Sequence, residues 1–190
     1  MAGLFPLVVG LGNPGAEYAA TRHNFGFMVL DRWSSGPESR WKSAGFANAQ
    51  MARLTSGEWL LKPQEYMNLS GRAVQAALDW FKLAPEQVLV VVDDVSLPLG
   101  QLRFRSGGSD GGHNGLKSIA AALGTSSYAR LRGGVGAAEP ETDLADHVLG
   151  RFRKEEKGIL EQMIERAVEA LRHCEIHGVE SASASYNNRL

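Results

Sequence analysis

The sequence predicts one α/β domain over residues 1–190, built on a twisted mixed β-sheet with helices on both of its faces. Segments with strand and helix patterns alternate along the chain, and two of the strand segments are apolar throughout, as in strands buried on both faces. Two central segments have the pattern of a hairpin, which makes the sheet mixed rather than fully parallel. No repeat or linker divides the 190 residues, which suffice for one hydrophobic core.

The first half of the chain is expected to supply a buried strand, a helix and a hairpin. Residues 4–11 form a continuous apolar run, with Pro6 near its start, where a missing amide costs little. Residues 46–54 and 58–62 have strand patterns and are joined by a short polar turn. A helix before this hairpin ends at residues 34–37 (Ser-Ser-Gly-Pro), and its apolar residues recur at helical spacing: Phe25, Met28, Val29 and Trp33.

A second helix and two further strands are expected next. Ser70 can cap a helix that ends before Pro85. Residues 88–92 are another apolar run, so they predict a second buried strand, which ends at an Asp-Asp pair. Residues 102–105 alternate apolar and basic side chains, the pattern of a more exposed strand.

The last third of the chain is expected to hold a glycine-rich loop, two helices and a strand. The loop covers residues 107–112 and leads into a helix over residues 114–123, which Gly124 stops. Residues 131–135 return to a strand pattern. Residues 155–177 predict an amphipathic terminal helix whose apolar face is made by Ile159, Met163, Ala167 and Leu171.

Composition and charge exclude several classes of protein. No apolar run approaches the roughly 20 residues that a membrane span needs, so no membrane partner is expected. The amino terminus lacks the pattern of a signal peptide and Cys174 is the single cysteine, which together predict a protein of the reducing cytoplasm. The net charge is −1, but one segment is basic, and such a cluster is either a phosphate-binding patch or solvated surface. It holds Arg103, Arg105, Lys117, Arg130 and Arg132 against Asp110.

The segment Gly10-Leu11-Gly12-Asn13-Pro14-Gly15 follows the first strand and matches the dinucleotide-binding pattern G-x-G-x-x-G. A dinucleotide fold also needs a packed helix directly after the glycines and an acid at the end of the next strand. Residues 16–24 are too poor in periodic apolar side chains for that helix, and Asp31 lies within a helical pattern. A nucleotide-binding oxidoreductase is therefore an alternative, whereas the favoured interpretation is a tight turn that holds Asn13 in place.

Five side chains near the ends of strands and helices are candidates for chemistry. His23 lies shortly after the Asn13 turn, and Asp93 ends a buried strand, where a carboxylate can orient an imidazole and stabilise its charged form. Asn13, Asn68 and Asn114 stand in separate loops and would supply uncharged donors and acceptors that suit an ester carbonyl and ribose hydroxyls. No serine or cysteine has the nucleophile-elbow pattern, so water is the expected nucleophile.

Two other patterns have simpler interpretations than ligand binding. His173, Cys174 and His177 could approach a metal ion at i,i+4 spacing, but no matching pair of ligands stands elsewhere, so packing near the helix end is favoured. The glycines of residues 107–112 could cradle phosphate, yet no P-loop lysine follows them, and a mobile lid is favoured. Neither a metal nor a cofactor is predicted.

Four segments in this order resemble the bacterial peptidyl-tRNA hydrolase family, and the resemblance covers almost the whole chain. The segments are Val9-Gly10-Leu11-Gly12-Asn13-Pro14-Gly15, Thr21-Arg22-His23-Asn24, Tyr66-Met67-Asn68-Leu69-Ser70-Gly71 and Gly111-Gly112-His113-Asn114-Gly115-Leu116-Lys117. The resemblance implies a mixed-sheet α/β monomer of the cytoplasm that needs no metal. It also implies hydrolysis of the ester between a peptide and the 3′ ribose of peptidyl-tRNA, which frees tRNA from stalled translation. The partner would be the acceptor stem and 3′ CCA end of that tRNA.

The family pattern also assigns roles to residues of this sequence. His23 matches the general base that activates water, Asp93 the carboxylate that orients His23, and Asn13 the residue that helps to tell a blocked aminoacyl group from a free one. An ester with a ribose leaving group is already activated, so a neutral imidazole, one water and preorganised donors suffice. The remaining matches are expected to bind the peptide, the 3′ end and the phosphates of the tRNA: Tyr18, Tyr66, Met67, Asn68, His113, Asn114, Arg105 and Arg132.

The chain departs from the family pattern at three places. Ser96 stands where the family often has an acid, Gly133 where isoleucine is usual, and Ala137-Ala138 where basic or proline residues are usual. These departures concern the expected contacts to tRNA and leave the His23 and Asp93 set untouched. A non-catalytic RNA-binding protein is the second alternative, because chloroplast intron-splicing factors resemble the same family. The absence of a transit-peptide pattern disfavours it.

Overall fold

A computed structural model of the protein describes residues 3–36 and 40–187 and contains one sheet of seven strands in the order β2-β3-β4-β1-β5-β7-β6. The central strands β4, β1, β5 and β7 are parallel, whereas every pairing made by β2, β3 or β6 is antiparallel. The predicted mixed sheet is therefore confirmed. The strands are β1 (Leu7–Gly10), β2 (Lys42–Ser43), β3 (Ala49–Arg53), β4 (Trp59–Pro63), β5 (Val88–Asp94), β6 (Leu102–Arg105) and β7 (Ala129–Gly134).

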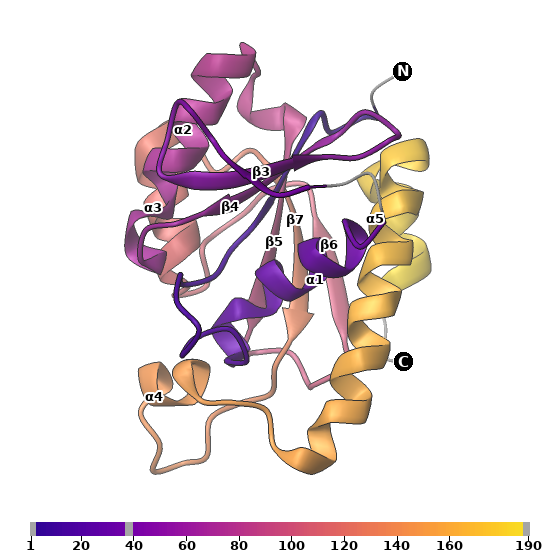
Figure 1. Ribbon diagram of the computed structural model, residues 1–190. Coiled ribbons are helices and arrows are strands. Elements are labelled where there is room, and N and C mark those ends of the chain that lie inside the picture. Colours follow the sequence, from indigo (N-terminus) through magenta and orange to yellow (C-terminus); the bar gives the residue numbers. More distant parts are fainter. Residues whose placement is uncertain (1–2, 37–39, 188–190) are drawn as a thin grey trace.

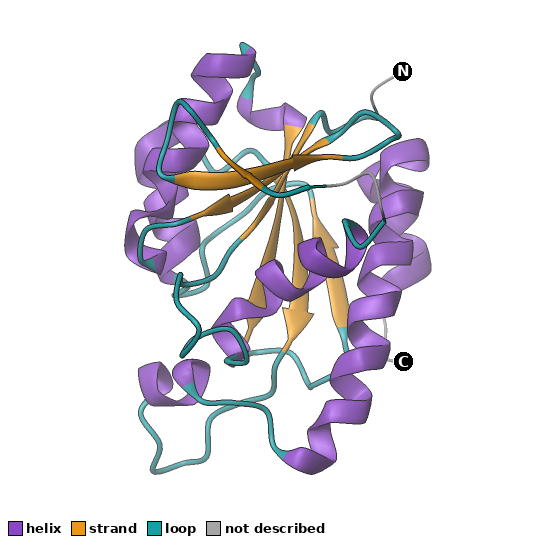
Figure 2. Cartoon of the chain, viewed as in Figure 1, coloured by secondary structure: helices purple, strands orange, loops and turns teal. Residues whose placement is uncertain are grey.

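Helices cover both faces of the sheet, as predicted (Figures 1 and 2). Helices α1 and α5 lie on one face and α2 and α3 on the other, while α4 lies beyond the ends of the strands (Figure 1). The helices are α1 (Phe25–Trp33), α2 (Ser70–Phe81), α3 (Asn114–Leu123), α4 (Leu144–Leu149) and α5 (Lys157–Tyr186).

The central strands are apolar along their length because both of their faces are buried. On β1, Val8 packs with the side chains of α1 and α5, whereas Leu7 and Val9 pack with those of α2 and α3. Strand β5 is also buried at every position, which explains the continuous apolar runs of the sequence. In the part of the chain that the structure describes, no helix has the length and apolar character to cross a membrane.

Gly10 at the end of β1 and Gly12 just after it allow helix α1 to pack closely against this strand. A Cβ at Gly10 would lie 2.5 Å from the carbonyl oxygen of Gly26, and a Cβ at Gly12 would lie 2.7 Å from the ring of Phe27. Turns and not a helix follow the glycine motif, and Asp31 lies inside α1. The predicted strand-end turn is therefore confirmed, and the helix that a dinucleotide site requires is replaced by turns.

The expected capping role of Ser70 is wrong. Ser70 is the first residue of α2, and its hydroxyl donates to the carbonyl oxygen of Met67 at 2.8 Å. The 3-10 helix η2 (Met67–Leu69) leads directly into α2 and brings that carbonyl within reach. The hydroxyl therefore acts as a donor within the preceding turn and accepts no helix amide.

The terminal helix differs from the prediction at both ends. Residues 154–156 form the 3-10 helix η4 (Lys154–Glu156), and α5 begins only at residue 157. The predicted end at His177 coincides with a break at Gly178, whose φ of 82° and ψ of 170° are not helical. A further helical segment then runs to Tyr186 and buries Ala182. The side chains of this segment are mostly small or polar, so its sequence shows no apolar pattern at helical spacing.

The short elements and the strand ends depart most from the sequence pattern. Strand β2 has two residues and α4 has six, too few to show a period. Residues 4–6 lie outside β1 because the N–H groups of Leu4 and Phe5 donate to Glu175, and Pro6 has none to donate. Residues 46–48 belong to the turn before β3. Pro37 of the expected helix stop lies outside the described residues.

Candidate active site

A cleft of about 360 Å³ lies beyond the carboxyl ends of β1 and β5, where ligands bind in sheets of this kind. Of the eleven site residues predicted from the sequence, ten line this cleft: Asn13, Tyr18, His23, Tyr66, Met67, Asn68, Asp93, His113, Asn114 and Arg132. The exception is Arg105. The remaining lining residues were not singled out as site residues: Asp94, Val95, Asp110, Gly111, Gly112, Leu144, Ala145, Val148 and Leu149.

His23 and Asp93 form a hydrogen-bonded pair at the floor of the cleft. His23 lies in the 3-10 helix η1 (Arg22–Asn24), directly before α1, and Asp93 lies near the end of β5. The imidazole Nδ1 is 3.0 and 3.1 Å from the two carboxylate oxygens of Asp93, and both side chains are buried. Because an ionised carboxylate can only accept, Nδ1 carries the proton and Nε2 retains a free lone pair.

His113 is a second imidazole on the same carboxylate. Its Nε2 lies 3.0 Å from Oδ1 of Asp93. Its Nδ1 accepts from the backbone N–H of Gly115 at 3.1 Å and of Leu116 at 3.4 Å, and so caps the amino end of α3. A ring nitrogen that accepts carries no proton, so the single proton of neutral His113 lies on Nε2 and points at Asp93. The resemblance placed His113 among substrate contacts and gave no sign of this bond.

We call His23, Asp93 and His113 the imidazole–carboxylate array. Burial alone would raise the pKa of Asp93, but the two imidazoles, His113 and His23, outweigh that effect and hold the pKa well below its ordinary range. Asp93 is therefore ionised at neutral pH despite its burial. An ionised Asp93 fixes the tautomer of both rings and can stabilise a positive charge on His23.

The side chains of the array are also potential metal ligands. The array is the group of three potential ligands that the described residues offer, with ligand atoms within 4.8 Å of one another. A histidine that binds a metal normally donates its second ring N–H to a neighbour. Nδ1 of His113 instead accepts two N–H bonds, so a metal on Nε2 would have to displace the only ring proton. The geometry fits a hydrogen-bonded array better than a metal site.

Asn13 is held with its amide group directed into the cleft. Its Oδ1 accepts from the backbone N–H of Met67 at 2.8 Å, which leaves Nδ2 as a donor. The side chain of Asn24 accepts from the backbone N–H of Asn13 and donates to its carbonyl oxygen, both at 2.9 Å. The turn after β1 is therefore fixed by a buried side chain that the sequence analysis did not single out.

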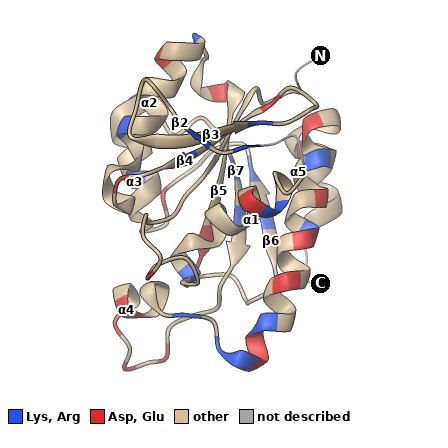
Figure 3. Cartoon of the chain, viewed as in Figure 1, with Lys and Arg blue, Asp and Glu red and all other residues tan. Residues whose placement is uncertain are grey.

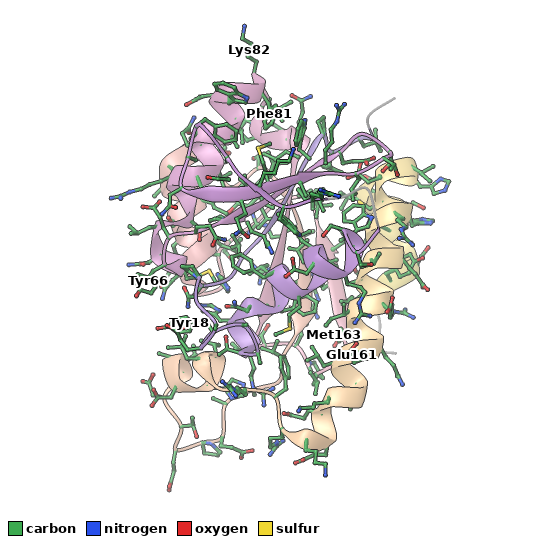
Figure 4. All side chains as sticks on the ribbon, viewed as in Figure 1. Tyr18, Tyr66, Phe81, Lys82, Glu161 and Met163 are labelled. Carbon is green, nitrogen blue, oxygen red and sulfur yellow. The ribbon has the colours of Figure 1, made fainter. Side chains whose placement is uncertain are left out.

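The rim of the cleft carries exposed polar and aromatic side chains. Asn68, within η2, and Asn114, at the start of α3, are both exposed, so their amide groups are open to a ligand. Tyr18 and Tyr66 lie edge to face with ring centroids 6.4 Å apart. Figure 4 shows both tyrosines on the side of the molecule that faces α4. Tyr66 is 60% exposed, which suits a side chain that stacks on a ligand.

Helix α4 forms an apolar wall opposite the array. Leu144 and Leu149, the two leucines of α4, line the cleft and are 50% and 42% exposed. We call α4 and its lining residues the α4 wall. The sequence offered one signal for this helix, because Asp143 caps it by accepting from the N–H of Ala145 at 2.8 Å. An Asp before a short apolar segment is a helix-start pattern that the acidic surroundings obscured.

Arg130 is not part of a basic surface, which corrects one member of the predicted patch. Its side chain is buried and donates to the carbonyl oxygens of Gly108, Ser109 and Ser126 at 2.8–3.0 Å. Burial lowers the pKa of Arg130. The arginine therefore anchors the first part of the glycine-rich loop that was expected to act as a lid.

The two arginines expected to bind phosphate lie in different places. Nη1 of Arg132 is 3.0 Å from Oδ2 of Asp94, and Nη2 donates to the carbonyl oxygen of Ser109 at 2.8 Å, on the wall of the cleft. Arg105 is exposed at the far end of β6, where it pairs with Arg130 in the register and lines a separate surface depression beside α5. The structure therefore brings Arg132 to the array and leaves Arg105 away from it.

The departures from the family pattern have local explanations. Gly133 faces the core, where a Cβ would lie 2.2 Å from the ring of Phe25, so the large ring occupies the space of a side chain at this position. Ser96 donates its backbone N–H and its hydroxyl to Oδ1 of Asp94, which closes the turn after β5. Ala137-Ala138 lies in the loop between β7 and α4.

The histidines and cysteine of α5 lie near Glu175, which binds the segment before β1, and none of them lines this cleft. Cys174 is fully buried in the core, and burial raises the pKa of its thiol to about 12. The rings of His173 and His177 are 4.5 Å apart, and Nε2 of His173 is 2.9 Å from the hydroxyl of Ser181. These contacts agree with packing near the helix break and not with a shared metal site.

Comparison with known proteins gives consistent results. The family model described as peptidyl-tRNA hydrolase matches residues 7–190. The peptidyl-tRNA hydrolase of Synechocystis sp. (strain ATCC 27184 / PCC 6803 / Kazusa) is 45% identical over 188 residues, which is 96% of each chain. That of Anaeromyxobacter dehalogenans (strain 2CP-C) is 47% identical over 186 residues, again 96% of each chain. The crystal structure of peptidyl-tRNA hydrolase from Acinetobacter baumannii superposes with a TM-score of 0.90 at 32% identity, covering 100% of this chain and 97% of that one.

Proposed function

The chain belongs to the peptidyl-tRNA hydrolase family, and from that membership we propose that His23 is the general base that activates water for the hydrolysis of peptidyl-tRNA. That the chain is a hydrolase of peptidyl-tRNA follows from the family itself. The observation that supports the role of His23 is its bond to Asp93, which keeps the proton on Nδ1 and leaves Nε2 free to take another.

In the proposed reaction, Nε2 of His23 removes a proton from water while the water oxygen attacks the ester carbonyl carbon. The carbonyl oxygen takes the negative charge, and the imidazolium that forms is stabilised by the ionised Asp93. The tetrahedral intermediate then expels the 3′ oxygen of the ribose, which receives the proton from His23. The products are the peptide carboxylic acid and a tRNA with a free 3′ hydroxyl, and the acid then ionises by releasing its proton to solvent, so atoms and charges balance.

The neutral amides of the cleft supply the remaining polar contacts in this proposal. The donor Nδ2 of Asn13 is free because its Oδ1 is held by Met67, so it can stabilise the developing oxyanion or bind the peptide carbonyl. Asn68 and Asn114 at the rim bind the peptide backbone and the terminal ribose. Tyr18, Tyr66 and the α4 wall take the apolar and ring surfaces of the substrate.

The proposed contacts to tRNA phosphate involve Arg132 and Arg105. Asp94 offsets much of the charge of Arg132, so this arginine contributes directed N–H donors more than net charge. Arg105 is exposed and its charge is screened by salt. The cleft is complete within one chain, which supports a monomer, and the substrate arises where translation takes place, which supports a cytoplasmic location.

The test of the base is His23→Ala assayed with a purified N-blocked aminoacyl-tRNA. We expect kcat to fall by about 10²–10⁴-fold, since this is the contribution of a positioned base. His177→Ala is the matched control, because His177 is an exposed histidine far from the cleft. Near wild-type turnover by His23→Ala would refute the proposal, and tRNA binding without cleavage by the unaltered chain would favour a non-catalytic RNA-binding protein. A chelator should leave the wild-type rate unchanged.

A further inference from the structure

We propose that Arg22 and Glu156 form a positioning pair that fixes the α4 wall relative to His23. We call them the Arg22–Glu156 pair. This inference rests on the proposed role of His23 as the base. Neither residue lines the cleft, and the two stand 134 positions apart in the sequence.

The guanidinium of Arg22 joins three segments directly behind the catalytic histidine. Arg22 precedes His23 in η1, and its Nη2 donates to Oε2 of Glu156 at 2.7 Å. Its Nη1 donates to the carbonyl oxygen of Val135 at 3.0 Å, and its plane lies over the ring of Phe152, 4.7 Å from the ring centroid. Arg22 and Glu156 are buried, at 5% and 9% exposed.

These contacts hold both ends of the segment that carries the α4 wall. The segment leaves the sheet at Val135, whose carbonyl oxygen binds the side chain of Arg22, and it returns at Gly150, whose carbonyl oxygen accepts the backbone N–H of Arg22 at 3.0 Å. Between these points, Nε2 of His147 lies 2.9 Å from the carbonyl oxygen of Gly136. Arg22, which directly precedes His23, therefore contacts both the start and the end of the segment that carries the α4 wall.

The charges of the pair persist in the buried setting. Burial would raise the pKa of Glu156, but the backbone N–H of Arg153 and the guanidinium of Arg22 outweigh it, so the pKa is lowered. A buried ion pair adds little net stability, because desolvation of both charges offsets their attraction. A role in geometry, next to the base and at both ends of the wall, explains the placement of the pair better. In Figure 3 the segment between α4 and α5 is coloured mainly blue, for Lys and Arg. Glu156, which follows in that segment, is buried.

In this proposal, the distance between His23 and the α4 wall determines where the bound ester lies relative to Nε2 of His23. A misplacement of about 1 Å caused by a change away from the reacting atoms can cost about 10²-fold in rate. Loss of the guanidinium removes the bond to Val135 and the bond to Glu156 together. We therefore expect the pair to affect kcat more than substrate binding.

The test compares Arg22→Met, Arg22→Lys and the double variant Arg22→Met/Glu156→Gln, each assayed at a temperature at which it is folded. The double variant removes the uncompensated charge that Arg22→Met leaves, and its glutamine can still accept from Arg153. We expect the melting temperature to recover in the double variant while kcat stays about 10²-fold low, with KM within about threefold of wild type. Arg22→Lys should regain about tenfold of the lost rate, because it restores one charged donor.

The matched control is Glu161→Gln, which breaks an exposed pair with Arg32 of the same 2.7 Å length and should leave kcat unchanged. Recovery of kcat together with melting temperature in the double variant would overturn the inference, because the pair would then be structural only. Wild-type turnover by His23→Ala, with the Arg22 variants impaired, would instead refute the base and locate the positioning effect elsewhere in the cleft. The two failures are therefore distinguishable.

Discussion

Asp93 and Glu175 are two buried carboxylates with opposite surroundings. Asp93 is 3% exposed and accepts from His23 and His113. Glu175 is 6% exposed, and its Oε2 accepts from the backbone N–H of Phe5 at 3.0 Å. A second carboxyl, that of Glu58, lies near Glu175. No hydrogen bond to Oε1 of Glu175 is found among residues 3–36 and 40–187.

The difference shows that burial keeps an acid neutral only where its neighbours do not outweigh the cost of desolvating the charge. Two imidazoles keep the pKa of Asp93 below its ordinary range. Burial, together with Glu58, raises the pKa of Glu175 to about 7, although the N–H of Phe5 lowers it in part. Asp93 therefore stays ionised at neutral pH and can stabilise a positive charge on His23. Glu175, which is about half protonated at pH 7, ties the segment before β1 to α5, and its backbone oxygen accepts from the N–H of Leu4.

The largest effect is expected from Asp93→Asn. One amide oxygen cannot replace two carboxylate oxygens that accept from His23 and His113, and it gives no charge to stabilise an imidazolium. We expect kcat to fall by about 10²–10⁴-fold in the N-blocked aminoacyl-tRNA assay. Glu175→Gln is the matched control and should keep kcat within about twofold. An equal loss of kcat in Asp93→Asn and Glu175→Gln would show that the assay reports folding, and the contrast between the two carboxylates would not hold.

The next largest effect is expected on stability, from Glu175→Gln. The pKa of Glu175 is about 7 in the folded chain against an ordinary 4.5, so the folded state holds the proton more tightly. The stabilisation is complete below about pH 4.5 and is lost as the pH rises to about 7, with an upper bound of about 3 kcal/mol. Glutamine keeps an acceptor for Phe5 and carries no charge. The free energy of unfolding in urea should match wild type at pH 4.5 and exceed it by about 1–3 kcal/mol at pH 8.

The contribution of Asp93 to the free energy of unfolding depends on pH in the opposite direction from that of Glu175, which sharpens this test. The pKa of Asp93 is lowered in the folded chain, so its contribution to stability is present above its ordinary pKa of 3.8. It is lost as the pH falls below 3.8 toward the lower pKa of the folded state. A Glu175→Gln variant with the same stability difference at pH 4.5 and pH 8 would show that Glu175 does not titrate in this range. The raised pKa of Glu175, and with it the contrast between Glu175 and Asp93, would then be wrong.

The long apolar elements could be predicted because burial leaves a period in the sequence. Strand β5 and helices α1 and α3 follow from continuous or helical apolar patterns. Helix α4 and strand β2 are too short for such a pattern. Strand β1 begins later than expected because the backbone N–H groups before it bind Glu175, a partner that stands far away in the sequence.

The residues of the site and the pairing of Asp93 with His23 could be predicted, but the other bonds of the site could not. His23, Asp93 and Asn13 stand at element ends, where the topology of a parallel sheet brings side chains to one edge. The bond of His113 to Asp93 and the contacts of Arg22 depend on side-chain directions across long sequence separations. Sequence spacing carries no information on such directions.

The smallest effect is expected from His113→Asn, and it separates two roles of one side chain. Asparagine is a good amino-terminal cap, so it can still accept from the N–H of Gly115, but it cannot place a donor where Nε2 meets Asp93. We expect the free energy of unfolding to change by less than about 0.5 kcal/mol, while kcat falls by about tenfold because Asp93 is held by His23 alone. His113→Ala should lose the same rate and about 1 kcal/mol of stability in addition. A wild-type kcat in His113→Asn would mean that one imidazole suffices to orient the carboxylate, and that the low pKa of Asp93 is maintained without the second.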